Sequence, residues 1–246
     1  MNITTEIDLT KVPKHIALIM DGNGRWAKKQ GHERLFGHSI GVEAVRETLK
    51  AATTIGVKYL TFYAFSTENW SRPQEEVEGL MNLMVRTIAG EIDELNTNGV
   101  RLSSIGDIQG LPDDCRAELE SAIEKTKKND KINLILALNY SSKWEITQAM
   151  KKIASKIEAG IINSDSITEE LISNEMCLMN IPDPELLIRT SGEQRLSNFL
   201  LWQCAYTEFY FTDVLWPDFK EKDLYQAVIN YQHRERRFGK VSEQII

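Results

Sequence analysis

The sequence contains no apolar run near the roughly 18–20 residues that a helix needs to cross a bilayer. Its longest apolar runs, at 16–20 and 134–138, are short and typical of buried strands. Residues 1–14 also lack the apolar core of a secretory signal. We therefore expect a protein that stays in the cytoplasm.

Cysteine and basic charge are scarce as well. The three cysteines, Cys115, Cys177 and Cys204, are an odd number and lie far apart, which fits reduced, buried thiols and neither a disulfide framework nor a zinc site. The chain carries 29 Lys and Arg against 36 Asp and Glu, a net charge of −7, so we expect no nucleic-acid partner. Small anionic ligands remain compatible with this charge, because a few placed arginines are enough to bind them.

What the chain does have is length and alternation. Its 246 residues, 42% of them hydrophobic, are enough to bury a substantial core without disulfides or metal. Short apolar segments alternate with segments of helical periodicity. We predict strands over 15–20, 58–65, 100–106, 132–138, 185–190 and 209–211, and helices over 38–55, 74–96, 113–128, 142–158 and 221–237.

Strands that are apolar throughout are typical of a parallel sheet covered by helices on both faces. Residues 159–184 are the best loop candidate, yet they are too few to separate two domains. We therefore predict one α/β domain over 1–246, with a mostly parallel central sheet flanked by helices and residues 1–12 as a loose N-terminal segment. In such sheets ligands bind beyond the carboxyl ends of the strands.

The first motif, DGNGRW at Asp21–Trp26, follows the first predicted strand. Its glycines allow a tight turn that points N–H groups at an anion, and Arg25 can add a bidentate phosphate contact. Asp21 can hold a magnesium ion that bridges phosphate oxygens. A tight turn with a solvated aspartate is the alternative. A dinucleotide fingerprint is disfavoured, since the acidic residue that it requires about 20 positions on falls at Glu43, inside a predicted helix.

Three further segments suit phosphate binding. Arg34 and His38 are four residues apart and can share a helix face, where they would supply charge and a proton relay. Residues 65–73 crowd Ser, Glu, Asn and Arg beside Trp, and residues 189–198 place two arginines and several hydroxyls around a glycine. Surface residues, the start of a helix and a solvated basic loop are the respective alternatives. With the first motif, these segments predict two anionic groups held close together with at least one metal.

The helices predicted over 38–55 and 74–96 are rich in small or flexible apolar residues. Such a stripe fits an ordinary core, and it also fits the wall of a long apolar cavity that opens on the phosphate site; the sequence leaves both open. The residues are Ala44, Ala51, Ala52, Met81, Met84 and Ala89.

Taken in order, the motifs resemble the cis-prenyltransferases, and among them the bacterial undecaprenyl diphosphate synthases. The resemblance covers residues 13–239 and rests on HIALIMDGNGRWAK, GHSIG, YAFSTENWSRP, IRTSGEQRLSNFLLWQCAYTEFYF and WPDF. It implies Mg²⁺-dependent, sequential condensation of isopentenyl diphosphate onto farnesyl diphosphate to give undecaprenyl diphosphate, the lipid carrier for cell-wall and surface glycans. It also implies a homodimer, transient contact with the inner membrane surface, and a long apolar tunnel walled by 38–55, 74–96 and 132–138.

The resemblance further implies a role for each matching residue. Asp21 would be the central catalytic residue and a magnesium ligand, with Glu208 as a further ligand. Asn69 would assist proton removal; because an amide is a poor base, we expect it to position the substrate or to relay a proton with Ser66, His38 or a diphosphate oxygen. The allylic diphosphate would contact Gly22, Asn23, Gly24, Arg25, Trp26, Arg34 and His38. The mobile loop would supply Ser66, Thr67, Glu68, Trp70 and Arg72, and isopentenyl diphosphate would contact Arg189, Arg195, Leu196 and Ser197. Arg237 and Gly239, in an R-x-G motif, would reach a diphosphate across the dimer interface.

Two positions depart from the family pattern. Ser191 stands where close bacterial relatives commonly have glycine, and Gln194 stands where some have a histidine assigned to metal binding. The DDxxD motif of all-trans prenyltransferases is absent, since Asp113-Asp114 is followed by Cys-Arg-Ala. Three alternatives remain: a shorter or different product, a non-catalytic partner subunit, and an unrelated phosphate-binding scaffold. The second is disfavoured because the DGNGRW residues and Glu208 are present.

Overall fold

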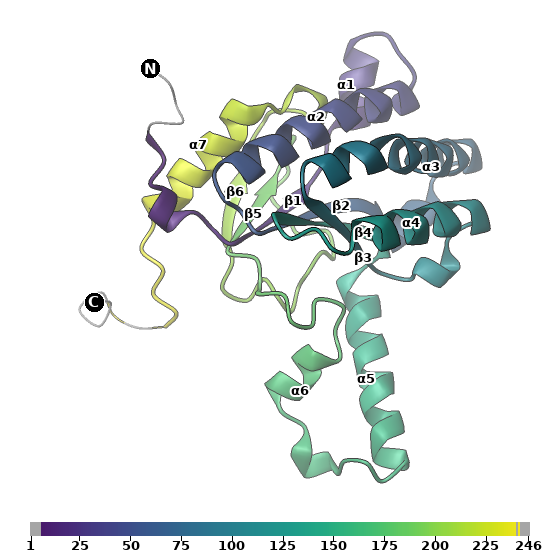
Figure 1. Ribbon diagram of the computed structural model, residues 1–246, viewed down its shortest axis with the longest axis vertical. Coiled ribbons are helices and arrows are strands. Elements are labelled where there is room, and N and C mark those ends of the chain that lie inside the picture. Colours follow the sequence, from purple (N-terminus) through teal and green to yellow (C-terminus); the bar gives the residue numbers. More distant parts are fainter. Residues whose placement is uncertain (1–5, 240, 242–246) are drawn as a thin grey trace.

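The computed structural model describes residues 6–239 and 241, and its centre is a parallel sheet (Figure 1). Within the described residues the sheet has six strands in the order β3-β4-β2-β1-β5-β6. Every neighbouring pair is parallel. The prediction of a single α/β domain built on a parallel sheet is confirmed. The strands are β1 (His15–Ile19), β2 (Tyr59–Ser66), β3 (Val100–Ile105), β4 (Ile132–Tyr140), β5 (Leu186–Arg189) and β6 (Glu208–Phe211).

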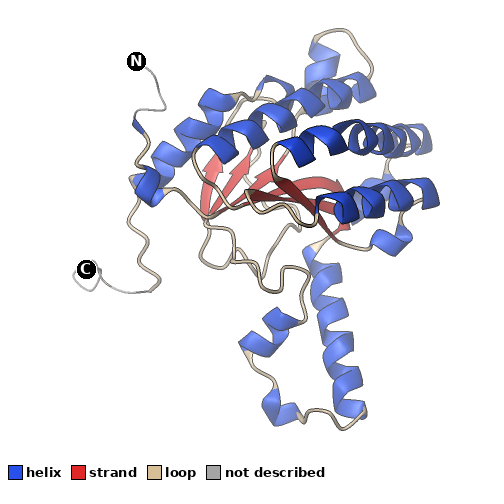
Figure 2. Cartoon of the chain, viewed as in Figure 1, coloured by secondary structure: helices blue, strands red, loops and turns tan. Residues whose placement is uncertain are grey.

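Four helices lie side by side over one face of the sheet, in the order α7, α2, α3, α4 (Figures 1 and 2). All four contribute side chains to one hydrophobic cluster on that face. α5 and α6 instead extend away from the sheet. The helices are α1 (Asn23–Lys29), α2 (Arg34–Thr54), α3 (Gln74–Thr97), α4 (Asp113–Thr126), α5 (Ser142–Glu158), α6 (Glu169–Asn174) and α7 (Glu221–Gln232).

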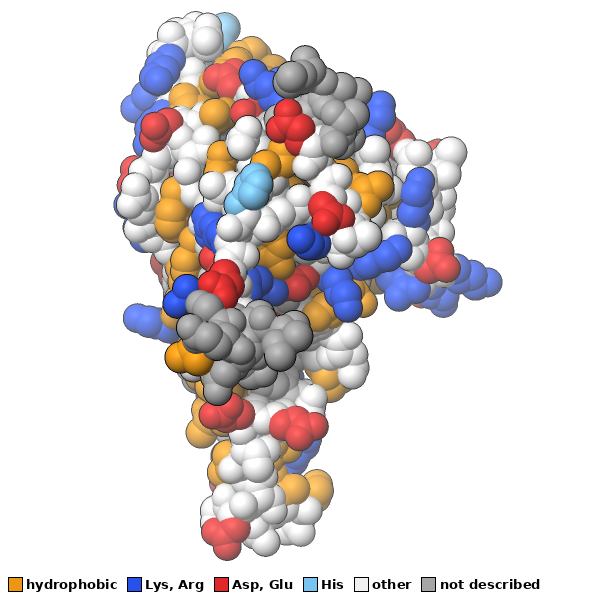
Figure 3. All heavy atoms as spheres, turned by 90° about the vertical axis from the view of Figure 1, so that its left-hand side faces the viewer, with side chains coloured by type: hydrophobic (Ala, Val, Ile, Leu, Met, Phe, Trp, Pro, Cys, Tyr) orange, Lys and Arg blue, Asp and Glu red, His pale blue; other side chains and the backbone are white. Residues whose placement is uncertain are grey.

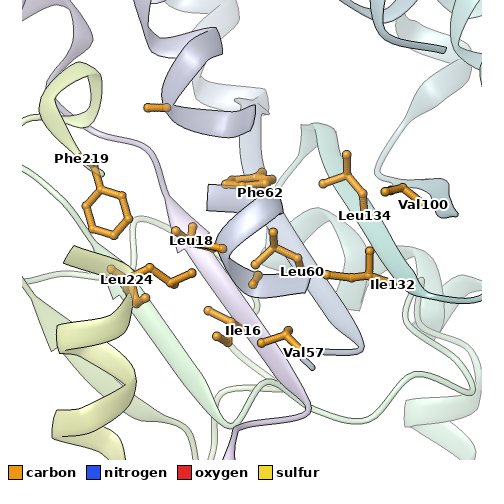
Figure 4. Packing of buried hydrophobic residues seen from close by; sticks show 14 of the residues in the cluster. Ile16, Leu18, Val57, Leu60, Phe62, Val100, Ile132, Leu134, Phe219 and Leu224 are labelled. Carbon is orange, nitrogen blue, oxygen red and sulfur yellow. The ribbon is translucent and has the colours of Figure 1, made fainter. Parts of the chain in front are cut away.

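Alternate residues of each strand belong to two separate cores. Ile16 and Leu18 of β1 pack under the helices, level with Leu60 and Phe62 of β2 respectively (Figure 4). Ala17 and Ile19 point to the other face, as the two-residue period of a strand requires. That second core is completed by residues of the 178–204 segment rather than by a long helix, so helices cover the two faces unequally.

Some element bounds differ from the sequence-based prediction. The glycine-rich motif forms the short helix α1 rather than a simple turn, and α2 begins at Arg34. The expected loop 159–184 contains α6. α7 ends at Gln232 because the following arginines leave the helix to bind elsewhere: Arg234 pairs with Glu208 at 2.9 Å and Arg236 with Glu185 at 2.9 Å.

Acidic and basic side chains are mixed on the face shown in Figure 3. Residues 1–5 of the expected loose segment lie outside the described residues. Farther on, Ile7 is buried, and Asp8 exchanges two hydrogen bonds with Gln232 of α7. Among the described helices, none combines the length and the apolar composition needed to cross a membrane.

Candidate active site

Three strand ends meet at one edge of the sheet. Asp21 follows β1, Ser66 ends β2 and Arg189 ends β5. These strands are neighbours because β1 lies between β2 and β5, and Ile19 is level with both Tyr63 and Arg189. The chain passes from β1 to β2 on one side and reaches β5 on the other. This is the topological switch point at which open α/β sheets bind ligands.

Asp21 lies at the centre of this edge, between two arginines. Arg189 donates from Nη2 to its Oδ2 at 2.9 Å, and Nη2 of Arg25 lies 3.2 Å from its Oδ1. Burial alone would raise the pKa of Asp21, but the hydrogen bond and charge of Arg189 and the charge of Arg25 leave that pKa below its usual range. Thr190 holds the backbone, since its hydroxyl donates to the Asp21 carbonyl at 2.6 Å. The carboxylate is therefore ionised and fixed in place.

Arg25 belongs to a small network with the loop after β5. It donates from Nη1 to the Ser191 carbonyl at 3.2 Å and from Nη2 to the Ser191 hydroxyl at 2.5 Å. Glu193 pairs with both Arg25, at 3.3 Å, and Arg195, at 2.5 Å. Ser191 adopts φ = 80°, a left-handed conformation that glycine adopts without strain. Position 191 is where the sequence departs from the family pattern. Serine there is more strained than glycine would be, but its hydroxyl accepts a hydrogen bond from Arg25.

The glycines of the DGNGRW motif allow close approach of other segments. Gly22 adopts φ = 109° at the start of α1, and a Cβ there would lie 2.8 Å from the Leu215 side chain. A Cβ at Gly24 would lie 2.8 Å from the Arg34 guanidinium, so Arg34 packs directly on α1. Asn23 donates to the Met20 carbonyl at 3.1 Å. The motif thus places the first turn of α1, with its free N–H groups, beside Asp21.

Arg34 and Arg72 share one carboxylate that the sequence analysis did not single out. Glu76, on α3, accepts from Arg34 Nε at 3.1 Å and from Arg72 Nη1 at 3.1 Å. His38 lies near this group, and burial, aided by the charges of Arg72 and Arg34 and opposed by that of Glu76, lowers its pKa to about 4. The imidazole is therefore neutral at pH 7.

The segment after β2 forms a short 3₁₀ helix, Thr67–Ser71. The Asn69 side-chain oxygen accepts the Ser66 backbone N–H at 3.0 Å, and Trp70 donates to Asn139 at 2.7 Å. Thr67 donates to Glu68 at 3.3 Å. The Asn69 oxygen is thus occupied by the chain itself, which suits a positioning role better than that of a base.

The loop after β5 returns to this 3₁₀ helix through Asn198, another residue outside the predicted set. Asn198 donates from Nδ2 to Glu68 at 2.7 Å, and its oxygen accepts the Lys143 N–H at the start of α5. Ser197 accepts from Arg189 Nη1 at 2.7 Å, while Leu196 packs against the second core. A short polar side chain in a polar loop carries no sequence signal for such a contact, so only the fold shows this link.

A cavity of about 750 Å³ opens at these residues and extends between α2, α3 and the sheet. Polar side chains line its mouth, and mostly apolar ones line the remainder on α2, α3 and the sheet. These walls include the helices and the strand expected around a hydrocarbon chain. The predicted site residues that line it are Asp21, Asn23, His38, Ser66, Glu68, Asn69, Arg72, Arg189, Arg195 and Ser197.

Four predicted residues lie away from this mouth. Glu208 starts β6 level with Leu186, about 10 Å before the carboxyl end of the strand, and pairs with Arg234. Trp26 donates to Asp218 at 2.8 Å. Arg237 pairs with Glu235, and neither Arg237 nor Gly239, both within the described chain, lines the cavity. Among the described residues, no group of three or more His, Cys, Asp and Glu could hold a metal.

Comparison with known proteins agrees with this arrangement. The family described as "Putative undecaprenyl diphosphate synthase" matches residues 19–239. The chain belongs to the undecaprenyl diphosphate synthase family of cis-prenyltransferases. The chain is 54% identical over 234 residues to an isoprenyl transferase of Porphyromonas gingivalis, covering 95% of this chain and 92% of that protein. It is 52% identical to an isoprenyl transferase of Clostridium perfringens, covering 93% and 90%.

Solved structures of this family share the fold. Lavandulyl diphosphate synthase from Lavandula x intermedia, in complex with dimethylallyl diphosphate, matches with a TM-score of 0.92 and 38% identity over 94% of this chain and 100% of that chain. A "probable undecaprenyl diphosphate synthase" from Campylobacter jejuni matches with a TM-score of 0.78 and 32% identity over 93% and 99%. As a member of the undecaprenyl diphosphate synthase family, the protein is a prenyltransferase, and the resemblance noted in its motifs is confirmed.

Proposed function

We propose that this chain is a magnesium-dependent enzyme that condenses isopentenyl diphosphate sequentially onto farnesyl diphosphate to give undecaprenyl diphosphate, the lipid carrier for cell-wall and surface glycans. One observation carries the proposal: Asp21 and Arg189 stand at the mouth of a cavity of about 750 Å³ whose deeper walls are mostly apolar. A charged mouth and an apolar interior suit a substrate with a diphosphate head and a hydrocarbon chain.

Two sets of basic side chains flank Asp21, and we assign one diphosphate to each. Arg25 and Arg34, beside the first turn of α1, suit the allylic diphosphate; Arg189 and Arg195 suit isopentenyl diphosphate. The Nε of Arg189 is buried and has no hydrogen-bond partner among the described residues, which leaves a donor for a ligand oxygen. Donors held in place here would stabilise the charge that develops as the allylic diphosphate departs.

A divalent metal fits beside Asp21. Magnesium in proteins is commonly held by one or two carboxylates together with substrate phosphates, and the ionised Asp21 side chain is 29% exposed at the cavity mouth. Magnesium bound there would supply positive charge to the leaving diphosphate. Glu208 of the same chain does not fit this position, because it lies at the opposite end of its strand; as a ligand it would serve the site of a second copy.

Condensation ends with the loss of a proton from the isopentenyl unit. We assign Asn69 to positioning, because its oxygen is bonded to the Ser66 N–H. The proton would pass to Ser66, to neutral His38 or to a diphosphate oxygen.

We propose that this cavity is the product tunnel and that its size sets the length of the product. A shorter product is the second candidate. It is supported by the structural relative lavandulyl diphosphate synthase, whose structure is a complex with dimethylallyl diphosphate.

We further propose that the chain acts as a homodimer in the cytoplasm, with transient contact at the inner membrane surface. The motif resemblance supports the dimer. Because Arg237 and Gly239 lie away from the cavity of their own chain, they would reach a diphosphate only in a second copy. The nearly insoluble product supports the membrane contact.

A product-length assay tests the proposal. Purified protein is incubated with farnesyl diphosphate, radiolabelled isopentenyl diphosphate and Mg²⁺, beside Asp21→Ala and EDTA controls. We expect a long polyprenyl product that both controls abolish. A short product would keep the chemistry and revise the length. No product from folded protein would instead favour a non-catalytic partner subunit.

A further inference from the structure

One stretch of the inner cavity wall is charged. Arg46 on α2 and Glu91 on α3 both line the cavity, among aliphatic neighbours such as Val45, Leu49 and Ile88. Both helices run from the mouth toward the amino ends of the strands. Arg46 lies eight residues beyond His38, which is about 12 Å along α2. The charged stretch therefore lies well inside the cavity and away from the diphosphate groups.

Arg46 links α2 and α3 across the line of contact between the two helices, which we call the seam. Its Nε and Nη2 donate to Oε1 of Glu91 at 2.9 and 2.5 Å, and its Nη1 donates to Glu43 of its own helix at 2.7 Å. The side chains of Arg46 and Glu91 are 43% and 18% exposed. The Arg46–Glu91 pair lines the cavity and is also partly exposed. It therefore forms part of the wall between the cavity and the solvent.

A second bridge crosses the same seam at the mouth. Arg34 of α2 and Glu76 of α3 are 3.1 Å apart, but Arg34 is also one of the residues that we assign to the allylic diphosphate. A bound diphosphate would compete with Glu76 for that guanidinium. With substrate present, the Arg46–Glu91 pair is then the one ion pair that, among the described residues, still links the two helices.

The two kinds of cavity wall differ in how easily they open. The sheet side consists largely of packed apolar side chains such as Phe62, Leu134 and Leu136, which resist displacement because interiors are close-packed. A partly exposed ion pair is weak and reversible. A growing hydrocarbon chain that fills the cavity therefore meets its least resistant boundary at Arg46 and Glu91.

We propose that the Arg46–Glu91 ion pair is a lateral latch that keeps α2 and α3 closed over the growing chain and thereby limits product length. The inference rests on the proposed function, since it assigns a specificity role to two residues that touch neither diphosphate. It differs from a length limit set by the cavity floor, because the latch acts through the seam between two helices.

The test compares product distributions of the wild type and the double variant Arg46→Ala/Glu91→Ala, which opens the seam without leaving an unpaired charge. We expect the most abundant product to lengthen by one or more isoprenoid units, with the rate of the first condensation unchanged. The matched control is Glu47→Ala/Lys220→Ala, which removes a partly exposed ion pair of 3.0 Å between α2 and the residue before α7; neither member lines the cavity. An apolar bridge, Arg46→Leu/Glu91→Leu, should keep the wild-type length. Unchanged or shorter products from the alanine pair would overturn the inference.

A second measurement does not depend on catalysis. The affinity of n-alkyl phosphates of increasing length should rise until the chain fills the cavity and then level off. In Arg46→Ala/Glu91→Ala we expect the levelling point to move to longer chains, whereas an unmoved point contradicts the latch. If the wild type elongates nothing, the proposed function fails, while this series still decides whether the pair closes the cavity.

Discussion

The guanidinium of Arg189 lies 2.9 Å from the carboxylate of Asp21, although 168 residues separate them in the chain. The same side chain donates to the Arg195 carbonyl at 2.5 Å and to the Ser197 hydroxyl at 2.7 Å. Only 4% of it is exposed. Arg189 therefore joins the carboxylate that we propose as catalytic to the loop that we assign to isopentenyl diphosphate.

Substitution Arg189→Lys should reduce kcat/KM for isopentenyl diphosphate by at least about a hundredfold. A single ammonium cannot replace a planar guanidinium with three separate contacts, and each hydrogen bond to a charged group contributes about 1.5–3 kcal/mol. Steady-state kinetics with both substrates measures the loss. Arg101→Lys, at an exposed arginine that bonds the Asn129 carbonyl, is the control. Near-wild-type kinetics for Arg189→Lys would refute the role that we give to the Arg189 guanidinium.

Substitution Ser191→Gly should weaken substrate binding while leaving the fold at least as stable. Glycine relieves the strain of φ = 80°, worth about 1 kcal/mol. It also removes the hydroxyl that accepts from Arg25 at 2.5 Å. We expect KM for the allylic diphosphate to rise severalfold and the melting temperature to stay level or increase. A lower melting temperature with unchanged KM would contradict this reading.

The order and type of most elements could be predicted because apolar periodicity reports which faces are buried. Ile16 and Leu18 mark one face of β1, and Val77, Met81 and Ile88 mark the buried side of α3. Helix α1 was missed because its glycines predict a turn, and only the conformation of Gly22 shows that a helix starts there.

The position of Asp21 and Arg25 at a strand end was predictable, because one motif follows one strand. Links between distant segments were not: Glu76 and Glu193 bind arginines from other elements, and neither carboxylate differs in sequence from a solvated one. Glu208 shows the opposite difficulty. Its identity suits a metal ligand, but strand direction places it at the far end of β6, and position in a sheet depends on pairing rather than on local sequence.

The free energy of unfolding should decrease as the pH is lowered from 6.5 to 4, and part of this decrease should depend on His15. This residue is fully buried; its Nδ1 lies 2.6 Å from the Pro182 carbonyl and its Nε2 lies 2.7 Å from the Thr61 hydroxyl. A carbonyl only accepts, so Nδ1 carries the proton and Nε2 accepts from Thr61. Burial lowers the pKa of His15 to about 4.

Because the unfolded state binds a proton near pH 6.5 and the folded state only near pH 4, acidification through this window favours unfolding, by about 3 kcal/mol in total. Urea unfolding at several pH values measures the slope. His15→Gln, which does not titrate, should show a shallower loss of stability over the same window. Parallel curves for the two proteins would show that His15 is not responsible.

Glu145 should prove important for stability rather than catalysis. This buried carboxylate accepts from the Tyr140 hydroxyl at 2.5 Å, Gln203 Nε2 at 3.1 Å and the Cys177 N–H at 2.9 Å. Glu145→Ala leaves three donors unpaired, and each buried unsatisfied group costs about 1–3 kcal/mol. We expect a loss of about 3–5 kcal/mol in urea unfolding, and a smaller loss for Tyr140→Phe. A change below about 1 kcal/mol for Glu145→Ala would show that water replaces the network.

The position of β1 between β2 and β5 has a consequence for synthesis on the ribosome. β1 can pair with β2 early, but its other edge must wait for β5, about 120 residues later. At roughly 5–20 residues per second, that interval is about ten seconds. Until then a strand edge stays open to wrong partners, and Asp21 has no Arg189 beside it. A nascent molecule thus carries Asp21 long before it has the Asp21–Arg189 pair to which we assign catalysis.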